Sequence, residues 1–294
     1  MGVPWRDFSG RFSPLKLAVF VALFGPALWT LMAFQLGWLE PRPFNEAIHR
    51  IGLWTIRLIF ITLAITPLRQ ILQWPRLLVV RRMVGVAAFA YAATHFTLYT
   101  TDQAFDLAKV ATEIVLRIYL TIGFATLLGL SALAATSTDG MVKRLGARRW
   151  QRLHRLVYVI ALLAAVHYWM QSKLEIWEPT IFAGIYVWLM GYRLLNRFVG
   201  VRGRLPLAWT GGLAVVAAAL TALGEAAYFR LAYGVDPMRV LDANLSLITG
   251  VRPAVIVLGL GLAVAALGVA RGFVSRPGRI LPYFAWTRPQ SSRR

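Results

Sequence analysis

The four histidines are the side chains of this sequence best suited to metal chemistry. They are His49, His95, His154 and His167, and the sequence contains no cysteine. A chain without cysteine has no disulfide, no thiolate-bound zinc or iron–sulfur cluster, and no C-x-x-C-H attachment of c-type haem. Any metal must therefore be held by histidine, methionine, carboxylate or backbone ligands.

The composition predicts that these histidines lie in a membrane. Of the 294 residues, 58% are hydrophobic and 15% are charged, yet the net charge is +20. A soluble chain of this length needs a more charged surface. The basic residues form short clusters between long apolar runs, which indicates a membrane and argues against nucleic acid. Segments that could cross ~30 Å of hydrocarbon lie at 16–39, 49–71, 82–100, 110–134, 151–171, 179–198, 207–231 and 252–274.

The charge pattern of the connections predicts the orientation. Basic clusters such as 81–82 and 148–149 fall on one side of the predicted membrane, and the other side carries most of the acidic residues. By the positive-inside rule, we expect an even number of spans with both termini in the cytoplasm. The first apolar run is longer than the core of a signal peptide and has no small-residue cleavage site, so we expect it to remain as an uncleaved span.

His95 and His167 are predicted to lie at one level of the membrane. At ~1.5 Å per residue, His95 lies roughly 20 Å and His167 roughly 25 Å from the basic side. Two neutral imidazoles at one height on neighbouring helices can hold a flat iron macrocycle from both faces, as in bis-histidine b-type haem. The plain alternative is two polar side chains that form hydrogen bonds between helices.

His154 is predicted to lie near the basic end of the fifth span, ~20 Å from His167 along a helix. No other histidine lies at that level, so a second cofactor there needs a different axial ligand, or is a flavin or quinone. Arg81, Arg82 and Arg155 are candidates for its propionates or phosphate, because arginine pairs well with oxyanions. The positive-inside rule alone also explains these arginines.

Arg57 and Arg117 lie inside the opposite ends of their spans, where topology does not explain them. They are candidates to pair with haem propionates. Arg117 could instead pair with Glu113, one turn away, or both arginines could extend to the interface. We expect His49, at the end of its span, to contact headgroups and water.

Several segments together resemble the MsrQ (YedZ) family. They are TPLR at 66–69, RRMVG at 81–85, LAATSTDG at 133–140, WQRLHRLVY at 150–158 and HY at 167–168. The resemblance implies a ferric-reductase-like, all-α polytopic bundle with a six-helix haem-binding core. We expect that core at 1–200, and two additional helices with a basic cytoplasmic tail at 201–294.

The resemblance also implies a function. MsrQ-like proteins are inner-membrane electron-transfer subunits that bind haem b and are described as binding FMN; they are not themselves the methionine sulfoxide reductase. Electrons come from a quinol or a cytoplasmic flavin reductase and go to a periplasmic molybdopterin reductase, MsrP, which repairs oxidised envelope proteins. The histidines of the family fall on His95, His154 and His167.

Two features depart from the family, and two other functions are possible. Where the family tends to have Arg-Pro-Tyr, this chain has Arg117-Ile118-Tyr119, so the packing of the fourth span is in question. The additional C-terminal spans contain no histidine, and we expect them to serve structure or docking. One alternative is a transmembrane ferric or cupric reductase, although no G-x-G-x-x-G nucleotide-binding unit is present. The other is a transporter whose histidines relay protons.

Overall fold

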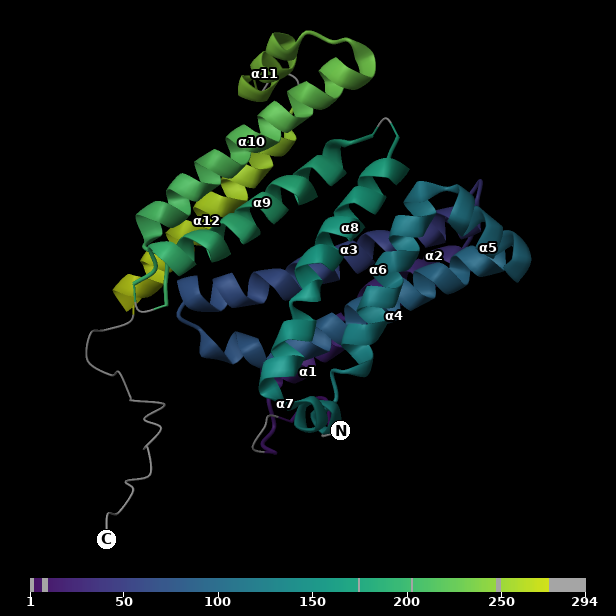
Figure 1. Cartoon of the computed structure of the whole chain (residues 1–294), viewed down its shortest axis with the longest axis horizontal. Helices are drawn as coiled ribbons and strands as arrows, with labels where there is room; N and C mark the ends of the chain where they lie inside the picture. The colour runs from purple at the N-terminus through teal and green to yellow at the C-terminus, as the bar shows by residue number, and fades with distance from the viewer. Residues whose placement is uncertain (1–2, 7–9, 174, 202, 247–249, 275–294) are drawn as a thin grey trace.

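The computed structural model is built entirely from helices in the part that it describes, residues 3–6, 10–173, 175–201, 203–246 and 250–274 (Figure 1). The predicted basic tail beyond residue 274 lies outside the described residues. The helices are α1 (Pro14–Ala22), α2 (Gly25–Gln35), α3 (Pro43–Ile71), the 3-10 turn η1 (Pro75–Leu77), α4 (Leu78–Asp102), α5 (Leu107–Leu116), α6 (Ile118–Ala135), α7 (Asp139–His154), α8 (Leu156–Gln171), α9 (Trp177–Phe198), α10 (Leu207–Tyr233), α11 (Pro237–Leu245) and α12 (Pro253–Val274).

The structure confirms an all-α polytopic bundle and refines the number of spans. Among the described residues, seven segments are long and apolar enough to cross a membrane, against the eight predicted. The predicted span at 179–198 forms α9, which is not among the seven. Because its two ends carry Glu178, Arg193 and Arg197, its crossing stays a prediction, as does the even number of spans.

Two predicted spans are broken. The first consists of α1 and α2, which meet where Pro26 opens α2. The Tyr91 hydroxyl accepts a hydrogen bond from the Ala27 amide (3.1 Å) and donates one to the Leu23 carbonyl (2.7 Å). It thus occupies the place of the missing helical bond between Ala27 and Leu23. The fourth span divides into α5 and α6 at Arg117, whose extended backbone (φ −112°, ψ 104°) breaks the helix although no proline is present.

The fifth predicted span begins later than expected. The apolar helix α8 starts at Leu156, and the preceding α7 is a separate, mainly polar helix. Figure 1 shows α7 at the end of the bundle where α1 begins. His154 therefore ends α7 and does not lie within the apolar helix that carries His167.

The C-terminal helices pack onto the rest of the bundle through α9 and α3. Close helix contacts support this packing, since a Cβ added at Gly268 of α12 would lie 2.8 Å from the side chain of Ile71 in α3. Arg193 of α9 donates to the Leu63 carbonyl of α3 (2.5 Å). Pro67, lacking an amide hydrogen, leaves that carbonyl without its helical partner, so the arginine satisfies a buried acceptor.

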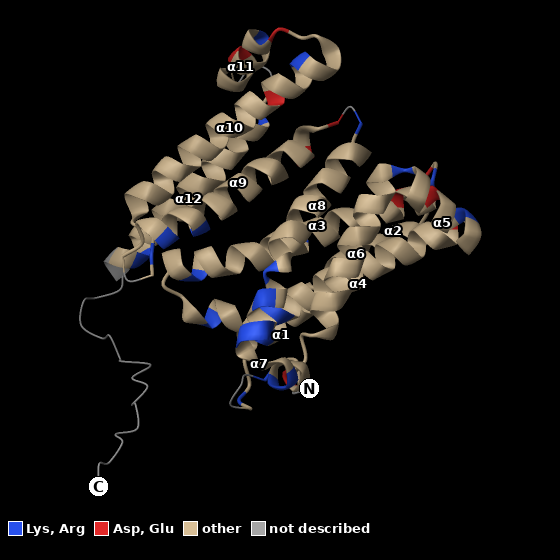
Figure 2. Cartoon of the chain, in the orientation of Figure 1, with Lys and Arg blue, Asp and Glu red and all other residues tan. Residues whose placement is uncertain are grey.

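Charge separates along the helix axes. Figure 2 shows lysines and arginines gathered around α7 and the nearby ends of α9, α10 and α12, whereas most acidic residues lie at the opposite ends, near α5 and α11. The charge asymmetry expected from the loops is therefore present in three dimensions.

Candidate functional site

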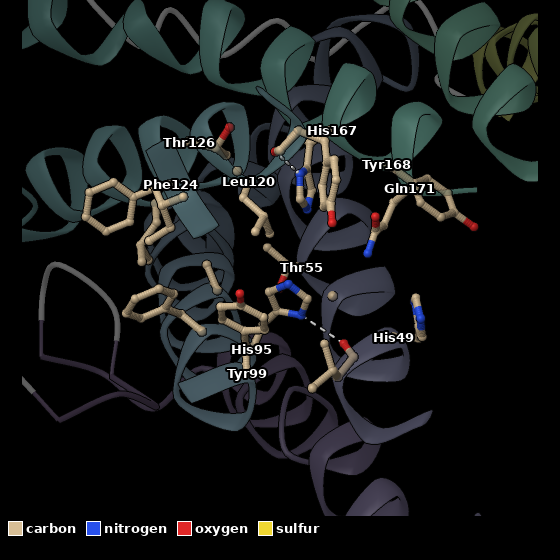
Figure 3. A pocket seen from close by; sticks show the side chains of 18 of the residues that line it. His49, Thr55, His95, Tyr99, Leu120, Phe124, Thr126, His167, Tyr168 and Gln171 are labelled. Carbon is tan, nitrogen blue, oxygen red and sulfur yellow. Dashed lines mark hydrogen bonds between the residues drawn. The ribbon is translucent and has the colours of Figure 1, made fainter. Parts of the chain in front are cut away.

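A cavity of about 550 Å³ lies between α3, α4, α5, α6 and α8 and is called here the histidine cavity. His49, His95 and His167 line it, and Figure 3 shows His95 and His167 pointing toward one another. Its interior is mainly apolar, with Leu53, Ile56, Ala92, Leu120, Phe124, Leu127 and Ala164 among the lining residues. Its volume is in the range of small-molecule and cofactor sites.

His95 and His167 are held by the same arrangement on two different helices. The Nδ1 of His95 lies 2.8 Å from the Ile48 carbonyl of α3, and the Nδ1 of His167 lies 2.7 Å from the Tyr119 carbonyl of α6 (Figure 3). A carbonyl only accepts hydrogen bonds, so each Nδ1 carries the proton in the neutral ring. Each Nε2 then keeps a free lone pair.

A glycine makes room for each imidazole. A Cβ added at Gly52 would lie 2.8 Å from the His95 ring, and one added at Gly123 would lie 2.7 Å from the His167 ring. Each glycine follows the accepting carbonyl by four residues, which places both on one face of their helix. Each histidine thus lies against a bare turn of helix and donates to the carbonyl one turn earlier. Sequence reasoning missed both glycines, because nothing local distinguishes them from other glycines in apolar helices.

The spacing of the rings fits two axial ligands of one metal. Their centroids are 6.4 Å apart and their planes are nearly perpendicular, at 84°. A metal–imidazole bond of ~2 Å on each side, and ~1 Å from each nitrogen to its ring centre, separate such rings by about 6 Å. Metal-ligating histidines also donate their other ring nitrogen to a carbonyl or carboxylate, which both do here. The residues present therefore fit a haem held from both faces.

His49 also lines the histidine cavity, although the sequence suggested only contact with headgroups and water. It lies on α3, one residue after the carbonyl that accepts from His95, and Figure 3 shows it at the edge of the site. It therefore adds a polar group to the cavity wall.

The surroundings of His154 differ from those of the two cavity histidines. Ser137, Trp150 and His154 itself form a cluster that is called here the His154 junction. Its ring stacks on Trp150 with centroids 3.8 Å apart. Its Nδ1 lies 3.1 Å from the Trp150 carbonyl and its Nε2 3.3 Å from the Ser137 hydroxyl. Both ring nitrogens therefore have partners within the protein.

The three arginines predicted near His154 lie around this junction. The charges of Arg81 and Arg82 act on His154, and Arg82 forms an ion pair with Asp139. Arg155 is exposed between α7 and α8. A role for these arginines in binding a second cofactor stays a prediction.

The two arginines predicted to meet propionates are both in ion pairs. Arg57 donates to Glu178 (2.8 Å), stacks over Trp54 and is not among the residues that line the histidine cavity. Arg117 lines the cavity and pairs with Glu113 (2.5 Å), which is the alternative that the sequence left open. Of the two, only Arg117 is placed to meet a ligand in the cavity.

Comparison with known proteins gives the class of this helical bundle, a ferric-reductase-like transmembrane component. The family model described as "Ferric reductase like transmembrane component" matches residues 51–165. This segment contains His95, Gly52 and Gly123, and it ends two residues before His167. No solved structure matches the chain.

Closer relatives give the particular family. Proteins named "Protein-methionine-sulfoxide reductase heme-binding subunit MsrQ" are similar to this chain. The one from Rhodospirillum rubrum is 43% identical, over 65% of this chain and 89% of the relative. The one from Xanthomonas campestris is 44% identical, over 60% and 81%. The one from Herminiimonas arsenicoxydans is 43% identical, over 61% and 84%. The chain belongs to the MsrQ family, as the sequence motifs predicted.

Proposed function

We propose that this chain binds haem b between His95 and His167 and carries electrons across the inner membrane. The observation that carries the proposal is the pair of imidazoles with tethered Nδ1 atoms and free Nε2 atoms, 6.4 Å apart in an apolar cavity. A bound haem supplies a one-electron redox couple, which no side chain of the protein provides. The names of the relatives, "heme-binding subunit", support this cofactor.

The protein contributes ligands and a partly apolar environment. The Ile48 and Tyr119 carbonyls fix the tautomer and orientation of the two imidazoles. Two imidazole ligands would favour a low-spin iron, and the apolar part of the wall suits the macrocycle. The haem site transfers electrons alone and requires no proton-transferring side chain, whereas a quinol donor would release two protons with its two electrons where it is oxidised.

The direction of transfer follows from the charge asymmetry. With the basic ends in the cytoplasm, both termini lie inside and the histidine cavity lies toward the periplasm. Electrons from a quinol or a cytoplasmic flavin reductase enter near the His154 junction and leave from the cavity. The acceptor is a periplasmic, molybdopterin-containing MsrP-like reductase that repairs oxidised methionines, in keeping with the relatives' names.

A second cofactor near His154 belongs to the same proposal. FMN, quinone or a haem with a different second ligand would be attracted by Arg81, Arg82 and Arg155. Because both nitrogens of His154 have partners, iron ligation there requires the ring to leave the Ser137 hydroxyl, which lies at the longer distance of 3.3 Å.

A reduced-minus-oxidised visible spectrum of detergent-purified protein tests the proposal. We expect a low-spin b-type spectrum in the wild type and its loss in His95→Ala and His167→Ala. It should survive in His154→Ala and in the control His49→Ala, which removes an imidazole from the same cavity wall. A wild type without haem after haem-supplemented expression would overturn the proposal and favour the transporter alternative.

A further inference from the structure

The rim of the histidine cavity carries charged side chains that the proposed iron ligation does not use. Asp102 of α4, Lys109 and Glu113 of α5, and Arg117 all line the cavity. Asp102, Lys109 and Arg117 are exposed and Glu113 is half-buried, so these charges are accessible at the open end of the cavity.

All but one of these charges have a partner nearby. Asp102 accepts from the Gln103 amide (3.2 Å), and Glu113 pairs with Arg117. The neighbouring Asp106 accepts from the backbone amide of Lys109 and so caps α5 (2.9 Å). Within the described part of the chain, the Lys109 ammonium forms no ion pair or side-chain hydrogen bond. The Lys109 ammonium at the cavity rim is therefore available to pair with an anionic group.

The orientation of α5 brings this cation to the cavity. Lys109, Glu113 and Ile114 of this helix line the cavity, and Lys109 and Glu113 lie one turn apart on the same side of α5. An anionic ligand group at this side of the cavity would give Lys109 a partner.

We propose that Lys109 binds a carboxylate of the ligand in the histidine cavity, namely a propionate of the haem. This inference rests on the proposed function. The macrocycle suits the apolar wall, and the two carboxylates that it carries require a polar end of the cavity. Lys109 takes the role that the sequence suggested for Arg57 and Arg117, both of which have carboxylate partners.

The test compares two haems in the full-length protein in nanodiscs. Wild type, Lys109→Gln and Lys109→Arg are each loaded with haem or with haem dimethyl ester, whose propionates carry no charge. The rate at which each protein loses its haem to an excess of apomyoglobin is then measured. Lys173→Gln is the matched control, because Lys173 follows α8 and is not among the residues that line the cavity.

With haem, we expect Lys109→Gln to raise the rate of haem loss roughly three- to tenfold, because the ion pair with the propionate no longer holds the haem. With the dimethyl ester, the same substitution should change the rate of loss by less than about 1.5-fold, since no carboxylate is present to pair with Lys109. Lys109→Arg and Lys173→Gln should resemble the wild type with both haems.

Equal changes in the rate of loss of both haems would overturn the inference, as expected if Lys109 acts through the fold or a lipid phosphate instead. No change with either haem would overturn it as well. If Lys109→Gln loses haem, then retention by Lys109→Arg supports the role of the charge, and loss from both variants contradicts it. Wild type that binds neither haem would defeat the proposed function and this inference together, which distinguishes that failure from the others.

Discussion

The histidine cavity and the His154 junction hold imidazoles of the same kind in opposite ways. In the cavity, each ring has one nitrogen tethered to a backbone carbonyl and the other left free. At the junction, the ring of His154 stacks on Trp150 and both its nitrogens have partners. The difference teaches that the contacts of the second nitrogen and the shape of the wall decide whether a histidine is ready to bind a metal.

The largest expected effect comes from filling the bare helix turns of the cavity. In Gly52→Ala and Gly123→Ala, the new Cβ would lie 2.8 Å and 2.7 Å from an imidazole, closer than atoms pack. The displaced ring loses its alignment, and we expect haem content per chain to fall at least ~10-fold. Haem is measured by absorbance after purification.

The control for this prediction is Gly85→Ala in α4. A Cβ there would meet its nearest atom, in Thr62, at an ordinary 3.6 Å. Alanine also favours helix by up to ~1 kcal/mol over glycine, so all three variants should fold. Normal haem content in Gly52→Ala and Gly123→Ala would show that the close contacts do not fix the imidazoles.

The features that set up this comparison were predictable to different degrees. Hydropathy and helical rise were enough to predict that His95 and His167 lie at one level, because each depth is counted along one helix and needs no knowledge of its neighbours. The roles of Gly52 and Gly123, and the place of His49 in the wall, depend on which helices pack together. Single-helix periodicity carries no such information.

The breaks in the helices show the same limit. The division at Arg117 occurs without the family proline, and the break before α2 is held by the hydroxyl of Tyr91, which comes from α4. The separate polar helix α7 could have been found from its lower hydropathy. The stacking of Trp150 on His154, four residues apart, was also within reach of helical spacing.

A second prediction concerns the junction, where we expect stability and not ligand binding to respond. Trp150 stacks on His154 and donates its indole N–H to the Thr136 carbonyl (2.8 Å), which ties α7 to the end of α6. In Trp150→Leu, loss of this bond and of the stacked surface should lower the free energy of unfolding by about 1–3 kcal/mol. Thermal unfolding in detergent measures the change.

The matched substitution is Trp209→Leu, since Trp209 is 51% exposed on α10. It should leave the unfolding temperature close to that of the wild type. The haem content of the cavity should be unchanged in both variants. Loss of the cavity haem in Trp150→Leu would show that the two histidine sites are coupled, contrary to the comparison.

The smallest expected effect is that of Ser137→Ala. The Ser137 hydroxyl lies 2.7 Å from the Leu133 carbonyl and 3.3 Å from the Nε2 of His154, so its main partner is the carbonyl. Removal of the hydroxyl should lower the free energy of unfolding by less than ~1 kcal/mol, because only this one side-chain hydrogen bond is lost and the helix around Leu133 is unchanged. The variant also releases the one side-chain contact that distinguishes the Nε2 of His154 from those in the cavity. If that contact alone withholds His154 from iron, the purified variant will contain more haem per chain than the wild type. An unchanged haem content would show that the wall around the ring, and not the hydroxyl, sets the difference between the two sites.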